Sequence, residues 1–175
     1  MDPSVLANRD PAEVAEEIGA TLNIVAVELA ALLKARAAAK KMTRNPERTM
    51  VGADNNNSLK FVPTPAEALE IMFARRRSGY MDAPTTMRSS FEDLKRHEYA
   101  TYAAMQKALS RLMLKLDPDT IEARVKVGAM GSKRARAWDA YRERWDAYTE
   151  PHENGILDVF LSHFAEAYED ASRKD

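Results

Sequence analysis

The three histidines of this chain are the side chains best suited to metal binding or to proton transfer at neutral pH. His97 follows Asp93 by four residues, so on a helix the two side chains would share one face, as paired metal ligands do. His97-Glu98 also begins like a zinc-protease motif, but Thr101 stands where the second histidine would be needed. One pair does not complete a metal site, so we predict no metal and no other cofactor. His163 lies within an apolar stripe, where we expect a hydrogen-bonded residue at the edge of the core.

The residue patterns of nucleophilic and nucleotide-dependent catalysis are missing from the sequence. The chain has no cysteine, and it contains no Gly-x-Ser-x-Gly elbow, no Walker A loop and no Gly-x-Gly-x-x-Gly fingerprint. Its 27 acidic residues form many close pairs, but so many acids on helices produce such pairs by chance. We therefore predict that the protein is not an enzyme.

Charged residues are segregated along a chain whose net charge is only −1. Basic residues gather in 34–48 and again in 133–144, whereas acidic residues dominate 146–175. Two interpretations remain open: solvated faces with intramolecular ion pairs, or a surface that docks an acidic partner. No nucleic-acid-binding module accompanies the basic clusters, so we predict no nucleic-acid partner.

Four aromatic residues at helical spacing form a stripe near the second basic cluster. They are Trp138, Tyr141, Trp145 and Tyr148. Trp and Tyr are enriched in interface hot spots, which would suit an exposed anchor. Such stripes more often pack in a core with their polar tips at its edge, and we favour this interpretation.

Helical periodicity dominates the elements that must position these residues. In 11–41 the apolar residues recur every three or four positions, and Asp10-Pro11 precedes them as a helix start. Further helices are expected from Thr64-Pro65, from about Pro84 to Leu116, after Asp117-Pro118, after Ser132 and from about Pro151. No stretch alternates with period two, so we predict no strands. The sequence thus predicts an all-α, single-domain bundle of about six helices over residues 11–172, after an N-terminal extension of residues 1–10.

The apolar stripes of these helices are expected to meet in one core. Its predicted members are Leu22, Val25, Leu29, Phe91, Leu94, Leu109, Leu112, Trp138 and Phe164. The stretch 42–63 is rich in Asn, Gly and Pro and too long for a simple connector. Its apolar residues can hold it against the bundle, so we predict one long ordered loop.

The chain carries no sign of a targeting or membrane-spanning segment. Its start lacks a basic region followed by a short apolar one. The most apolar stretch, 18–33, includes Asn23 and Glu28 and is shorter than the ~20 apolar residues that cross a bilayer. We therefore predict a soluble protein that does not insert into a membrane.

An ordered set of short segments resembles the C-terminal helical domain of type VI secretion-associated forkhead-associated (FHA) proteins of the TagH kind. The segments are Arg48-Thr49, Asn56-Asn57-Ser58-Leu59-Lys60-Phe61, Gly79-Tyr80, Phe91-Glu92-Asp93-Leu94, His97, Leu116-Asp117-Pro118 and Lys133-Arg134-Ala135-Arg136-Ala137-Trp138. Ser58 replaces a proline of the family pattern, and Glu98 stands where Gln is common. The phosphothreonine-reading FHA module has no counterpart in these residues, so phosphopeptide binding does not carry over.

The resemblance implies a cytoplasmic, non-enzymatic protein-interaction domain that assembles or regulates a bacterial type VI secretion system. Its expected partners are membrane-complex or baseplate proteins, with recruitment to the inner-membrane secretion complex. An all-α adaptor or scaffold unrelated to secretion remains the alternative.

The candidate partner-binding residues lie in the long loop and in the second basic cluster. They are Arg48, Thr49, Asn56, Asn57, Lys60, Phe61, Arg134 and Arg136. The loop is chosen because exposed polar loop residues often carry function and because the resemblance is dense there. The competing interpretation is structural: Asn56 and Asn57 would cap helix ends and satisfy buried backbone groups.

Overall fold

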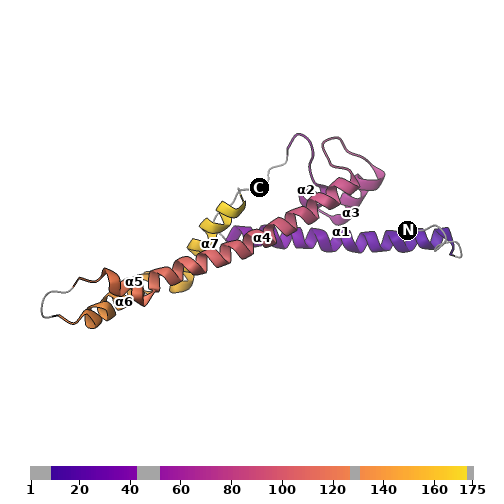
Figure 1. Ribbon diagram of the computed structural model, residues 1–175. Helices are drawn as coiled ribbons and strands as arrows, with labels where there is room; N and C mark the ends of the chain where they lie inside the picture. The colour runs from indigo at the N-terminus through magenta and orange to yellow at the C-terminus, as the bar shows by residue number, and fades with distance from the viewer. Residues whose placement is uncertain (1–8, 43–51, 127–130, 173–175) are drawn as a thin grey trace. The chain divides into compact units, whose positions relative to one another are not determined.

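The computed structural model describes residues 9–42, 52–126 and 131–172, and 80% of these residues are helical. The helices are α1 (Pro11–Met42), α2 (Ser58–Phe61), α3 (Pro65–Leu69), the π-helical turn η2 (Glu70–Ala74), α4 (Ala83–Leu116), α5 (Pro118–Arg124), α6 (Lys133–Thr149) and α7 (Ile156–Ser172). The described residues contain no strand, only an isolated bridge between Asn56 and Tyr80. The predicted all-α fold is confirmed (Figure 1).

Three predicted helix starts have the capping geometry that their residue types indicate. The Thr64 hydroxyl accepts a hydrogen bond from the Glu67 N–H at 3.2 Å and begins α3. The Asp117 carboxylate accepts from the Thr120 N–H at 2.8 Å and begins α5, while Ser132 caps α6. These starts were predictable because an N-cap needs only a short polar side chain next to its own helix.

Two elements differ from the sequence expectation. α7 begins at Ile156 rather than near Pro151, because a turn ending at Gly155, with φ of +59°, comes first. The predicted loop also contains the four-residue helix α2, which is too short to show any periodicity in the sequence.

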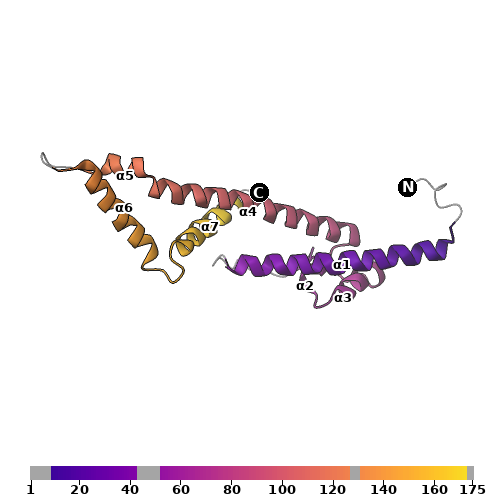
Figure 2. The same ribbon diagram turned by 90° about the horizontal axis from the view of Figure 1, so that it is seen from below.

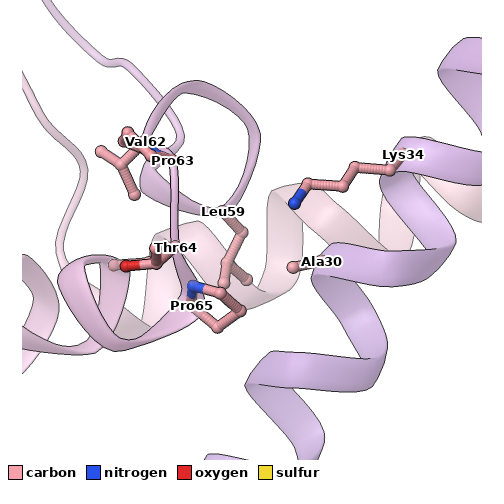
Figure 3. A pocket seen from close by; sticks show the side chains of 8 residues that line it. Ala30, Lys34, Leu59, Val62, Pro63, Thr64 and Pro65 are labelled. Carbon is pink, nitrogen blue, oxygen red and sulfur yellow. The ribbon is translucent and has the colours of Figure 1, made fainter.

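The described residues form two compact units, one comprising residues 9–39 and 52–95 and the other residues 40–42, 96–126 and 131–172. The core of the first unit lies between α1, α2, α3 and the start of α4. Its buried members include Ala26, Leu29, Leu59, Ala68 and Met72. Figure 3 shows Leu59 and Pro65 facing Ala30 of α1, and the recess that they line is too small to hold a water molecule.

The core of the second unit lies between α4 and α7. Ala100 and Ala104 of α4 pack with Ala167 and Tyr168 of α7, and Phe164 packs against this cluster. Small residues on both helices allow their backbones to approach closely, and the aromatic rings fill the remaining space. Two further helices of this unit, α5 and α6, pack against each other (Figure 2).

The prediction of one shared core is wrong, because the buried residues form two separate clusters. Leu29 is buried as predicted, but four other predicted members are exposed. These are Leu22, Phe91, Leu109 and Trp138, with exposed fractions of 36%, 46%, 51% and 62%. A helical stripe shows which side chains share a face, but only the arrangement of neighbouring elements decides whether that face is covered.

Within the described residues, α1 is a helix whose length and composition would allow it to cross a membrane. Its mean hydropathy reaches 1.6, and 22% of the apolar stretch is buried in the protein. A core helix of a soluble protein meets the same test. This stretch was expected to be too short to cross a bilayer, but the helix α1 has the length and composition to do so. Solubility therefore stays a prediction.

Candidate partner-binding surfaces

Asn56 organises the backbone where the long loop meets the turn before α4. Its side-chain amide both donates to and accepts from the backbone of Gly52, at 2.8 Å in each case. The same amide donates to the Gly79 carbonyl at 2.9 Å, and the Asn56 backbone bonds to Gly79 and Met81. Gly79 has φ of +87°, and a Cβ there would lie 3.0 Å from the Ala53 carbonyl oxygen, so glycine is required.

Asn57 joins α2 to α4 through a buried side chain that is only 2% exposed. Its carbonyl oxygen accepts from the Leu59 N–H at 3.0 Å and caps α2. Its amide nitrogen donates to the Ser90 hydroxyl at 2.8 Å and to the Thr86 carbonyl at 3.2 Å. Three of the four hydrogen bonds that this amide can form are thus made inside the first unit.

Asp93 forms ion pairs with two basic side chains of the first unit. Its carboxylate accepts from Arg36 of α1 at 2.9 Å and also pairs with Lys60 of α2. All three side chains are between 16% and 22% exposed, so solvent screens these pairs only weakly. Asp93 therefore links α1, α2 and α4, which the sequence did not reveal because the three residues lie far apart along the chain.

The structure favours the structural interpretation for the loop residues among the predicted site. Asn56 and Asn57 are buried, and Lys60 is engaged with Asp93. Phe61 is half-buried at the end of α2. Arg48 and Thr49 lie outside the described residues. The polar side chains of 56–60 are therefore held within the protein and are not displayed to a partner.

The two tryptophans of the α6 aromatic stripe are exposed and its two tyrosines are half-buried, so the prediction that the stripe packs in a core is wrong. α6 has no buried residue, and Trp138 and Trp145 are 62% and 41% exposed. Trp138 stacks on Tyr141 with ring centroids 5.7 Å apart and planes 11° from parallel. This stacking orders a large apolar surface that faces solvent, which is the property of an interface anchor.

A groove of about 440 Å³ lies between the end of α4, α5 and α6. Its apolar lining includes Leu116, Pro118 and Ile121, and Trp138 and Tyr141 form its aromatic wall. Ile121 is buried at the groove floor, with 3% exposure. The volume lies within the range of pockets that bind small molecules or single side chains of a partner.

The positive charge of α6 is concentrated at the end of the helix that borders this groove. Lys133, Arg134 and Arg136 are exposed there, and Arg134 lines the groove. Lys133 lies 4.0 Å from Glu122, whereas Arg134 and Arg136 have no ion-pair partner among the described residues. Cations in a first helical turn are unfavourable with respect to the helix dipole, so these charges do not serve the stability of α6.

Two of the histidines have different surroundings in the second unit. His97 bonds through Nδ1 to the Tyr168 hydroxyl at 2.6 Å, while its predicted face-mate Asp93 pairs with cations. His163 was expected to be hydrogen-bonded, but neither ring nitrogen has a partner among the described residues. Burial therefore lowers the pKa of His163, and the positive charge of Lys115 adds to this effect. The described residues contain no group of three or more acidic or histidine side chains placed to hold a metal.

Comparison with protein families places these two units in a defined class. The sequence matches the C-terminal domain of the type VI secretion system FHA protein over residues 1–171, and the chain belongs to this family. The match confirms the resemblance seen in the short segments of the sequence. No curated protein and no solved structure gives a match.

Proposed function

We propose that this chain is a non-enzymatic protein-interaction domain that helps to assemble or regulate a type VI secretion system. Membership of the family supports a role associated with type VI secretion. The observation that carries the interaction role is the exposed surface of α6, where stacked aromatic rings and Arg134, which has no ion-pair partner among the described residues, border an apolar groove. Trp, Tyr and Arg are the residue types that dominate binding energy at protein interfaces.

The expected partners are the membrane-complex and baseplate proteins of the same secretion system. A protein of this kind acts in the cytoplasm and reaches the inner-membrane secretion complex by binding one of them. Catalysis is not part of the proposal, since neither the sequence motifs nor the residues around the groove supply a nucleophile with an adjacent base.

Direct binding tests this function. The purified full chain is immobilised, and each membrane-complex and baseplate protein from the same bacterium is passed over it separately. We expect one of these proteins to bind reproducibly, and we expect deletion of the chain to reduce secretion by the system. A helical protein of similar size and charge serves as the control for adsorption. Binding to none of these proteins, together with normal secretion in the deletion strain, would contradict the proposal.

A further inference from the structure

The groove between α5 and α6 has an open apolar interior that the described residues do not fill. Leu116, Pro118 and Ile121 form its lining on one side, and the stacked rings of Trp138 and Tyr141 form the other. The Trp138 side chain is 62% exposed. A partner that covers it would gain binding free energy in proportion to the apolar area that is buried. The shape and lining therefore suit one bulky apolar side chain of a partner.

The border of the groove determines which partner segment could bring such a side chain. Arg134 lines the groove and is exposed without an ion-pair partner in the described part of the chain, whereas Arg136, two residues further along α6, is not among the lining residues. Glu122 is the acidic residue in the lining, and Lys133 lies close enough to offset its charge. The border is therefore positive, and complementary charge on a partner is negative.

We propose that the α5–α6 groove binds a short acidic segment of a partner protein, with one large apolar side chain inserted beside Trp138 and a carboxylate paired with Arg134. This proposal rests on the proposed function, because it specifies the kind of segment that a secretion partner contributes. A bidentate arginine–carboxylate pair at the edge would fix the direction of the segment, and the aromatic wall would supply most of the affinity.

Two other occupants fit the groove less well. A nucleic acid would stack on Trp138, but it binds through many phosphates, and Arg134 is the one basic side chain among the described residues that line the groove. A second copy of this chain would have to offer an acidic segment such as α7, whose Glu166 and Asp170 already pair with Arg111 and Lys107. An acidic segment of another protein meets neither objection.

The test uses the purified full chain and an array of short overlapping peptides that cover the membrane-complex and baseplate proteins. We expect the bound peptides to share acidic residues around one aromatic or large aliphatic residue. Trp138→Ala and Arg134→Glu should each weaken binding of these peptides by about tenfold or more. Arg136→Glu changes an exposed charge of the same helix that is not part of the groove lining, so it serves as the matched control and should bind normally.

A second measurement reports on the groove itself. The chain has two tryptophans, so Trp145→Phe leaves Trp138 as the only one. Addition of a bound peptide should shift the Trp138 emission to shorter wavelength, because the ring leaves water. Circular dichroism confirms that each variant folds, which the exposure of these side chains leads us to expect.

Several outcomes would overturn the inference, and one of them separates it from the proposed function. Binding of an intact secretion protein that survives both groove variants would refute the groove site and leave the interaction role standing. Binding to no secretion protein at all would refute the interaction role as well. A labelled single-stranded oligonucleotide that binds through Trp138, or a dimer that Trp138→Ala dissociates in sedimentation, would assign the groove to another occupant.

Discussion

Replacing Asn57 with Ala tests whether the loop before α4 is a scaffold. The change removes the cap of α2, which costs about 1 kcal/mol and leaves the buried N–H of Leu59 unpaired. It also removes the two hydrogen bonds to Ser90 and Thr86, each worth about 1 kcal/mol. The Ser90 hydroxyl still donates to the Thr86 carbonyl, so these two groups are not orphaned. We expect a total loss of about 3 kcal/mol of unfolding free energy.

Urea denaturation followed by circular dichroism measures this loss. Asn57→Ser keeps a capping oxygen but no amide donor, so its loss should be about 2 kcal/mol. Asn55→Gly is the matched control, because Asn55 is exposed, has φ of +59° and therefore tolerates glycine; its change should stay within about 0.5 kcal/mol. A loss below about 1 kcal/mol for Asn57→Ala would show that the buried network contributes little, and the scaffold interpretation would be wrong.

Four further changes test the second unit by denaturation. Tyr168→Phe removes the hydroxyl that bonds His97 and should cost about 1 kcal/mol; an unchanged stability would contradict that bond. Leu109→Ala should cost less than about 1 kcal/mol because half of this side chain is exposed, and a loss of 2 kcal/mol or more would show that it is buried. Glu98→Gln should be neutral within about 0.5 kcal/mol, since Glu98 is exposed; a large loss would indicate a required charge. The pKa of His163 is lowered in the folded protein, so the unfolded chain binds more protons and stability should fall as pH drops below about 6.5. His163→Gln should reduce this pH dependence, and an unaltered profile would contradict the burial effect.

The helices and their starts follow from local residue patterns. Thr64, Asp117 and Ser132 each cap the helix that begins beside them, so the information needed is contained in a few neighbouring residues. The family resemblance was likewise readable, because its segments keep their order along the chain. The short helix α2 escaped prediction, since four residues are too few for a periodic pattern.

The sequence by itself determined the all-α class, the helix starts and the family. Only the tertiary structure decided which apolar and polar faces are covered, because burial depends on residues that lie far away in the chain. It buried Asn57 against Thr86 and Ser90, which turned a predicted recognition residue into part of the scaffold. It also left Trp138 exposed beside the groove, where the periodicity of α6 alone had favoured a core position.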